Sequence, residues 1–152
     1  MANDASRSTA PSRPVTLLFA CVHNAGRSQM AAAIFNALAE PALARGISAG
    51  TEPAQRVHPE VVETMREIGI DLSGAKPRRL TDELAREASM LVTMGCGENC
   101  PHVPGLTVVD WEIPDPKGRP PEDVRVIRET VQACVVRLIH AHGWEKPVDS
   151  KP

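Results

Sequence analysis

The residues with the clearest chemical potential form the segment Cys21-Val-His-Asn-Ala-Gly-Arg27-Ser28, which has the pattern Cys-x5-Arg-Ser. When a loop of this length leads into a helix, several backbone N–H groups can point at one tetrahedral anion. Arg27 would add a planar charged fork for two oxygens of the anion, and its charge would stabilise the thiolate of Cys21. The segment therefore predicts a nucleophilic cysteine beside an oxyanion site. The predicted oxyanion-binding residues are Val22, His23, Asn24, Ala25, Gly26, Arg27 and Ser28.

The other residues of this segment suit supporting tasks. Ser28 could donate a hydrogen bond to the Cys21 thiolate or cap the following helix, and Asn24 tolerates left-handed backbone angles. Gly26 is expected to let the backbone come close to the anion. His23 is expected to tune the loop rather than to act as a base. The alternative is a buried cysteine at a strand end followed by an unrelated surface arginine.

A second reactive segment, Asp110-Trp-Glu-Ile-Pro-Asp115-Pro116, holds three acids. A carboxyl group above a bound anion could protonate a departing oxygen or take a proton from an attacking thiol. Proline restricts the preceding residue to extended angles, so Pro116 would help to fix the direction of the Asp115 carboxyl. Asp-Pro is also common in surface turns, and without the cysteine segment a plain turn would be the better interpretation.

Two further cysteines lie close together in Met94-Gly-Cys96-Gly-Glu-Asn-Cys100-Pro-His102. Thiols are a source of the two electrons that a reduction needs, in a chain without a flavin or nicotinamide motif. A zinc site is the rival interpretation, because Cys96, Cys100 and His102 are soft ligands, but a structural zinc site usually takes four ligands and no nearby fourth is obvious. Cys134 lies among apolar residues of a predicted helix and is expected to be a core cysteine.

The surrounding sequence predicts strands that alternate with helices. Residues 15–20 form a short apolar run, typical of a strand that is buried on both faces. Alternation of strands and helices favours a parallel sheet with helices on both faces, an α/β three-layer sandwich with a four-stranded parallel sheet. The predicted strands are 15–20, 45–49, 89–94 and 106–111, and the predicted helices are 28–39, 58–68, a short one from Thr81, and 123–142.

Three predicted loops leave the carboxyl ends of these strands and carry reactive residues: 21–28, 95–100 and 112–116. In open α/β sheets, ligands bind outside the carboxyl ends of the strands. The sequence therefore predicts a single site to which all three loops contribute.

The composition is that of an ordinary globular protein. Of 152 residues, 42% are hydrophobic and 24% are charged, and the formal net charge of -2 gives no electrostatic reason to expect nucleic acid or an anionic membrane as partner. No apolar run could span a bilayer and no secretory signal is recognised, so a cytoplasmic location is expected. With two Trp, two Phe and no Tyr, the core is expected to consist of Leu, Ile, Val, Ala and Met. The predicted domains are a disordered tail at 1–14, a single catalytic domain at 15–143 and a C-terminal tail at 144–152.

The Cys-x5-Arg-Ser pattern directly after the first predicted strand resembles the signature of the low-molecular-weight protein tyrosine phosphatase family. Within that family, the stretches HNAGRSQMAAA, SAGTEPAQRVHPEVVETMREIGIDLSG and DWEIPDP resemble the arsenate reductase branch. The resemblance covers roughly residues 15 to 142. It implies a phosphatase-like fold, Asp115 as general acid, and an arsenic-detoxifying reduction of arsenate for which phosphate and sulfate compete.

The arsenate reductase branch also implies a thiol relay. Cys21 attacks arsenate, Cys96 then attacks Cys21 and releases arsenite, and Cys100 moves the disulfide to the Cys96–Cys100 pair, where a reductant such as thioredoxin can reach it. Thioredoxin-coupled members have a longer segment between the two relay cysteines, whereas only three residues lie between Cys96 and Cys100. The Gly-Cys-Gly-x-x-Cys-Pro pattern looks more like members that use mycothiol together with mycoredoxin, a glutaredoxin-like protein. The electron donor therefore stays open.

Two other functions remain as alternatives. A phosphatase acting on phosphomonoesters would use the same loop without redox chemistry, but it would leave Cys96 and Cys100 without a task, and no tyrosine is present to match the regulatory tyrosines of that family. A non-catalytic oxyanion- or zinc-binding module is the third interpretation. Potassium-binding members carry a glutamate where this chain has Ala32, so no cation site and no cofactor are predicted.

Overall fold

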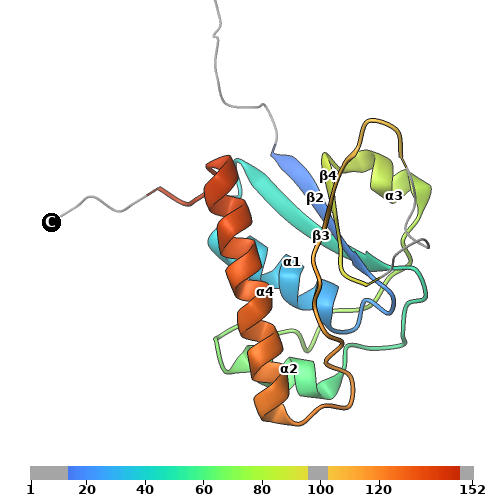
Figure 1. Cartoon of the computed structure of the whole chain (residues 1–152), viewed down its shortest axis with the longest axis vertical. Helices are drawn as coiled ribbons and strands as arrows, with labels where there is room; N and C mark the ends of the chain where they lie inside the picture. Colours follow the sequence, from blue (N-terminus) through green and yellow to red (C-terminus); the bar gives the residue numbers. More distant parts are fainter. Residues whose placement is uncertain (1–13, 96–102, 148–152) are drawn as a thin grey trace, which may run out of the picture.

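Four parallel strands form the central sheet, in the spatial order β3-β2-β4-β5 (Figure 1). The computed structural model describes residues 14–95 and 103–147 of the chain. The register pairs Cys21 with Gly50 and Thr93 with Asp110, so the strands end at one edge of the sheet. The strands are β2 (Val15–Cys21), β3 (Ala44–Gly50), β4 (Met90–Thr93) and β5 (Thr107–Asp110).

Helices cover both faces of this sheet, which confirms the predicted α/β three-layer fold. One face carries α1 (Arg27–Leu38), α2 (Pro59–Arg66) and α4 (Pro121–His142), and the other carries the short α3 (Asp82–Glu87) (Figure 1). Thr81 is the N-cap residue of α3, as expected, and its side-chain oxygen accepts a hydrogen bond from Leu84 N at 3.1 Å.

The two faces of β2 belong to two separate cores. Leu17 and Phe19 pack into the larger core with α1 and α4, whereas Leu18 and Ala20 pack into the smaller core under α3. Successive strand residues point to opposite faces, so burial of both faces explains the continuous apolar run. The expectation of a purely aliphatic core is wrong: Phe19 and Phe35 are fully buried, with ring centroids 5.6 Å apart, and fill the space between β2 and α1.

The element boundaries differ from the predicted ones by one or two residues. Helix α2 ends at Arg66 rather than at Ile68, because the chain turns at Gly69, where φ is +82°, and Ile70 N bonds back to Met65 O. Strand β5 is short and largely exposed since it is the edge strand, and Val108 on it is 52% exposed.

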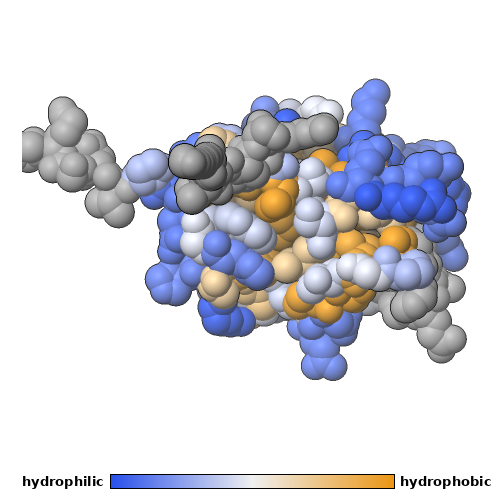
Figure 2. Space-filling model, turned by 90° about the horizontal axis from the view of Figure 1, so that it is seen from above, coloured by the Kyte–Doolittle hydropathy of each residue, from blue (hydrophilic) through white to orange (hydrophobic). Residues whose placement is uncertain are grey.

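Figure 2 looks at the molecule from above, from the end where β2 and β3 begin, and shows apolar residues interspersed with hydrophilic ones. In the parts of the chain that the structure describes, no helix combines the length and the apolar character needed to cross a membrane. The reactive residues lie at the opposite end, where the strands finish.

Candidate active site

The loop after β2 has its carbonyl oxygens turned outward. Four of them accept hydrogen bonds from backbone N–H groups of the segment that connects β3 to α2, at 2.7 to 3.2 Å. These bonds attach the loop at four points to the segment that follows β3, and they satisfy carbonyl groups that would otherwise be unpaired. The four pairs are Thr51 N to Cys21 O, Glu52 N to Val22 O, Ala54 N to His23 O, and His58 N to Ala25 O.

The amino end of α1 faces this loop. The helix starts at Arg27, its N-cap residue Gly26 makes no side-chain cap hydrogen bond, and its first turn contains no acidic residue. The positive end of the helix dipole is therefore not neutralised by a local carboxylate, which favours a bound anion there.

Cys21 meets the start of this helix through Ser28. The residue Cys21 is 2% exposed, and its sulfur lies 2.9 Å from Ser28 Oγ. Asn24 Nδ2 donates to the same Oγ at 2.7 Å. Since the amide nitrogen can only donate, Ser28 accepts from Asn24 with one lone pair, and toward a Cys21 thiolate, which has no hydrogen, the Ser28 O–H would be the donor. Of the two predicted tasks for Ser28, the geometry fits the hydrogen bond to the thiol and not the helix cap.

Asn24 is the residue that organises the loop. Its φ is 52°, the left-handed value that the sequence predicted as tolerable, and its side chain is fully buried. Its Oδ1 accepts from Arg78 N at 2.9 Å and from Gln29 Nε2 at 3.2 Å. Arg78 N is a backbone donor, so the Asn24 atom that faces it must be the oxygen. The other end of the Asn24 amide, which faces Ser28, is therefore the nitrogen and donates to it.

Sequence reasoning missed Gln29 and the segment around Arg78. Gln29 is 7% exposed, and its Nε2 also bonds Asn24 O at 3.1 Å and Lys76 O at 3.4 Å. A buried glutamine on a helix needs such partners, so the polar residue after Arg-Ser was the available signal. Arg78 carried no local signal, since its contact with Asn24 spans 54 positions of sequence.

Arg27 and Asp115 lie together above the loop. Arg27 Nη1 donates to Ile113 O at 3.2 Å, and Nη2 lies 3.9 Å from Asp115 Oδ2. The Arg27 side chain is 11% exposed and the Asp115 side chain 45%. Segments 21–28 and 112–116 therefore meet as expected, with the guanidinium between the loop and the carboxylate.

Gly26 lies against the turn that carries Asp115. A Cβ on Gly26 would lie 2.8 Å from Pro116 Cγ, so a side chain here would push the Asp115 turn away. Gly26 has φ -144° and ψ -86°, outside both the helical and the extended regions. The absence of a side chain on Gly26 thus lets Pro116 come close to the cysteine loop, and the predicted approach of the Gly26 backbone to an anion stays a prediction.

His58 is a further titratable group at this edge that the sequence did not single out. Its backbone N–H is already bound to the loop, and its ring lies against Gly26. Burial lowers the pKa of His58 below 6.5, and the nearby carboxylates of Glu60 and Asp115 offset this only in part. The imidazole is therefore neutral at pH 7. His23, by contrast, bonds Glu52 O through Nδ1 at 3.0 Å, which fits the expected structural task in the loop.

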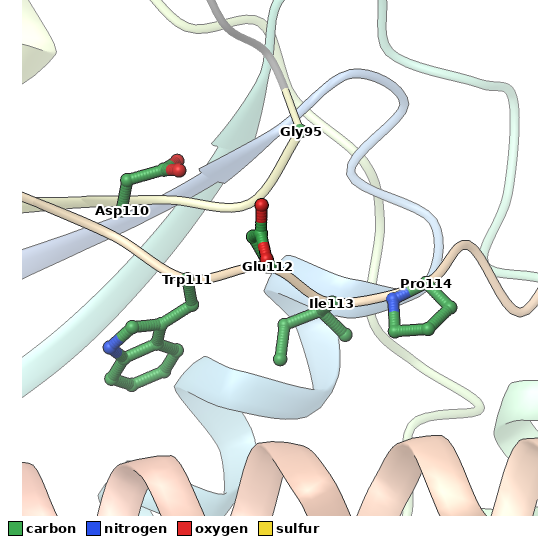
Figure 3. A pocket seen from close by; sticks show the side chains of 6 residues that line it. All are labelled: Gly95, Asp110, Trp111, Glu112, Ile113 and Pro114. Atoms are coloured by element: carbon green, nitrogen blue, oxygen red, sulfur yellow. The ribbon is translucent and has the colours of Figure 1, made fainter.

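A cavity of about 610 Å³ borders the site between the ends of β4 and β5. In Figure 3, Trp111 and Ile113 point toward the helices below, whereas the carboxylates of Asp110 and Glu112 lie on the side of Gly95. Asp110 Oδ1 accepts a hydrogen bond from Thr93 Oγ1 at 2.5 Å, so one oxygen of this carboxylate is bound to the last residue of β4. Of the three acids in this segment, Asp115 is the one paired with Arg27.

Cys96, Cys100 and His102 lie outside the described residues, and the predictions for them stay predictions. Within the described ranges, no three His, Cys, Asp or Glu side chains are grouped so that they could hold a metal ion. Cys134 is partly buried on α4, packs against the larger core and receives an Arg137 Nη2 contact at 3.5 Å. Ala32 is a buried residue of α1.

The fold and this edge define a class of α/β proteins in which a Cys-x5-Arg loop joins the first strand to the first helix. Residues 16–147 match the family model described as low molecular weight phosphotyrosine protein phosphatase. The chain belongs to this family.

Among curated relatives, the chain is similar to a provisionally assigned arsenate reductase of Halobacterium salinarum, at 39% identity over 79% of this chain and 87% of the relative. It is also similar to a glutaredoxin arsenate reductase of Synechocystis, at 34% identity over 81% of this chain and 95% of the relative.

Two solved structures illustrate the range of activities on this fold. The thioredoxin-dependent arsenate reductase of Corynebacterium glutamicum superposes with a TM-score of 0.75 at 36% identity, over 90% of this chain and 64% of that one. An arginine phosphatase of Geobacillus stearothermophilus gives 0.74 at 26% identity, over 86% of this chain and 94% of that one.

Proposed function

We propose that this chain reduces arsenate to arsenite, with Cys21 as the nucleophile and the loop from Val22 to Ser28 as the oxyanion site. The observation that carries the proposal is the thiol of Cys21 at 2.9 Å from Ser28 Oγ, at the open amino end of α1 and beside the Arg27–Asp115 pair. A tetrahedral anion there would meet backbone N–H groups, a guanidinium and a nucleophile together. The relatives named above support arsenate as the anion.

In the first step, the Cys21 thiolate attacks arsenic and forms a sulfur–arsenic(V) bond. One arsenate hydroxyl leaves as water after it takes a proton from the carboxyl group of Asp115, which lies 3.9 Å from Arg27 Nη2. Arg27 and the amino end of α1 would stabilise the negative charge on the remaining oxygens.

In the second step, another thiolate attacks Cys21 Sγ. The electron pair of the sulfur–arsenic bond goes to arsenic, which leaves as arsenite, and a disulfide remains on Cys21. The attacking thiol is Cys96 if the internal relay operates, and Cys100 then transfers the disulfide to the Cys96–Cys100 pair. Two thiols are oxidised for each arsenate reduced, so a thioredoxin- or glutaredoxin-type donor, or a small thiol such as mycothiol, must restore them.

A phosphomonoesterase is the second candidate, and the family description and the arginine phosphatase among the structural relatives favour it. The same loop would bind a phosphoryl group, and water would release it from Cys21. Phosphate and arsenate are both tetrahedral oxyanions, so weak hydrolysis of an aryl phosphate is expected in either case. The two candidates differ in redox chemistry: arsenate reduction oxidises two thiols to a disulfide, whereas phosphate hydrolysis oxidises none.

The test is a single turnover of prereduced full-length protein with arsenate and without external thiol, followed by measurement of arsenite and peptide mapping of disulfides. About one equivalent of arsenite with a Cys96–Cys100 disulfide would support the internal relay. Arsenite that forms only after mycothiol or glutaredoxin is added would support a small-thiol mechanism, in which Cys96 and Cys100 are not essential.

Two cysteine variants make the assignment specific. Cys21→Ser should abolish arsenite formation and aryl phosphate hydrolysis, whereas Cys134→Ser should leave both unchanged because Cys134 is a residue of α4 that packs against the larger core. No arsenite with any donor, together with Cys21-dependent phosphate hydrolysis, would replace the reductase by the phosphatase. Hydrolysis that survives Cys21→Ser would overturn the site itself.

A further inference from the structure

The segment that carries Asp115 is a small turn with its own internal hydrogen bonds. Asp115 Oδ1 accepts from Lys117 N at 3.0 Å, and Arg119 Nε donates to Asp115 O at 2.8 Å. Gly118 has a φ of +71° and completes the turn. These contacts set the shape of the turn, but they do not determine where the turn sits relative to Cys21.

Three contacts attach this turn to the rest of the molecule, and one of them is the ion pair between Arg27 Nη2 and Asp115 Oδ2 at 3.9 Å. The ring of Pro116 packs on Gly26, an apolar contact without a preferred direction. Glu60, in the first turn of α2, accepts a hydrogen bond from Gly118 N through Oε2 at 2.7 Å. Among the described residues, this is the hydrogen bond by which a side chain of a neighbouring helix holds the turn from Asp115 to Gly118.

The Glu60 contact has the strength expected of a charged acceptor. Partial burial raises the pKa of Glu60, but the hydrogen bonds from Gly118 N–H and from its own backbone N–H lower it by more, so the group is a carboxylate at neutral pH. A hydrogen bond from a backbone N–H to a carboxylate is shorter and stronger than one between neutral groups. The amino end of α2 is itself tied to the cysteine loop through His58 N and Ala25 O, at 2.9 Å.

We propose that Glu60 is a positioning residue, whose carboxylate keeps the Asp115 turn in place over the Cys21 loop. The connection runs from the loop through the start of α2 to Gly118, and three residues back along the turn to Asp115. Glu60 touches neither the anion nor the sulfur. The inference rests on the proposed function, in which Asp115 donates the proton to the departing oxygen.

The test compares Glu60→Ala, which removes the acceptor, with Glu60→Gln, which keeps a neutral acceptor of the same length. Glu63→Ala is the matched control, because Glu63 is on the same helix, its side chain is 73% exposed, and its ion pair is with Arg66 one turn away. A displaced general acid slows proton donation without loosening the anion site, so Glu60→Ala should lower kcat by roughly tenfold and leave KM nearly unchanged. Glu60→Gln should recover most of kcat.

The leaving group distinguishes proton donation from a general loss of structure. With aryl phosphates, the loss in Glu60→Ala should be larger for phenyl phosphate, which needs protonation, than for p-nitrophenyl phosphate, which does not. Equal losses on both substrates, or a Glu60→Ala variant that behaves like Glu63→Ala, would overturn the inference.

A measurement without turnover separates this inference from the proposed function. Hydrogen exchange of the Gly118 amide, followed by NMR, should be slow in the wild type and in Glu60→Gln and much faster in Glu60→Ala. If the wild type neither reduces arsenate nor hydrolyses aryl phosphates, the proposed function fails, and the exchange rates still decide whether Glu60 holds the turn. Unchanged exchange in Glu60→Ala would show that it does not.

Discussion

At the scale of single residues, the site depends on a chain of hydrogen bonds whose direction can be worked out. Arg78 N donates to Asn24, Asn24 donates to Ser28, and Ser28 has one hydrogen left for Cys21. The first two donors are determined in this way. The third bond runs from Ser28 O–H to the sulfur when Cys21 reacts as a thiolate, because a thiolate has no hydrogen to donate.

Ser28→Ala should therefore slow the chemistry of Cys21. A hydrogen bond to a charged group contributes about 1.5–3 kcal/mol, which corresponds to about 10- to 100-fold in rate. We expect that loss in turnover, and a parallel loss in alkylation of Cys21 by iodoacetamide, read by peptide mapping. Ser73→Ala, at an exposed serine after α2, is the control and should leave both rates unchanged. An unaltered alkylation rate in Ser28→Ala would contradict the donor role of Ser28.

At the scale of elements, the end of β3 is as close to the cysteine loop as backbone can come. A Cβ on Gly50 would lie 2.6 Å from Val22 O and 2.8 Å from Asn24 N. Both atoms are backbone, so no side-chain rotation could relieve the contact.

Gly50→Ala should consequently distort the loop. Overpacking of this kind costs about 1–3 kcal/mol, and we expect that loss in the free energy of unfolding together with weaker binding of phosphate as a test anion. Gly74→Ala is the matched control, because a Cβ there would meet nothing within 4 Å. Urea denaturation and calorimetric titration provide the two measurements. Equal behaviour of the two variants would mean that the loop tolerates the shift.

Helices α2 and α4 are joined by Glu67, whose carboxylate bonds Arg125 Nη2 at 2.8 Å and Arg128 Nη1 at 2.9 Å. These two arginines lower the pKa of Glu67 from 4.5 to about 2. A carboxyl with a depressed pKa in the folded state contributes stability above pH 4.5, and this contribution is lost as the pH falls toward 2.

Glu67→Gln should thus lower the free energy of unfolding at pH 7, and its difference from the wild type should shrink between pH 4.5 and 3. Because Glu67 is exposed, the difference should also shrink in 1 M NaCl. Urea denaturation across this pH range checks the expectation. A difference that stays constant with pH would assign the effect to packing rather than to charge.

At the scale of the whole molecule, the chain after α4 returns to the core. Trp144 packs edge-on against Phe35, with ring centroids 6.0 Å apart, and its carbonyl accepts from Glu40 N at 2.8 Å. The predicted end of the folded domain at residue 143 remains a prediction. It is tested by how much the Trp144 side chain contributes to the free energy of unfolding.

Trp144→Ala should lower the free energy of unfolding by about 2 kcal/mol, because it removes an aromatic contact from the edge of the larger core. Val126→Ala, on α4 at a position that is 61% exposed, should change it by less than about 0.5 kcal/mol. Thermal or urea unfolding measures both. A Trp144→Ala variant as stable as Val126→Ala would support a domain that ends at residue 143.

Much of the fold could be read from local patterns. The apolar run of β2, the Thr81 cap and the apolar spacing of α4 are properties of neighbouring residues, and alternating strands and helices leave few arrangements other than a parallel sheet. Cys21 and Arg27 could be named because their types and short spacing have chemical meaning, and Asp115 because its segment resembles that of the arsenate reductase branch. Gln29, His58 and Glu60 could not, since each looks like an ordinary helix residue until its partner is known.

The sequence by itself determined the class of fold and the position of the Cys-x5-Arg segment between the first strand and the first helix, because both follow from patterns within a few residues. Only the tertiary structure decided which acid stands beside Arg27, which hydroxyl lies beside the sulfur, and why Gly26 and Gly50 lack side chains. The physical reason is distance along the chain: Arg27 meets Ile113 across 86 positions, and Glu60 meets Gly118 across 58. Contacts of this range exist only after the sheet has brought the strand ends to one edge.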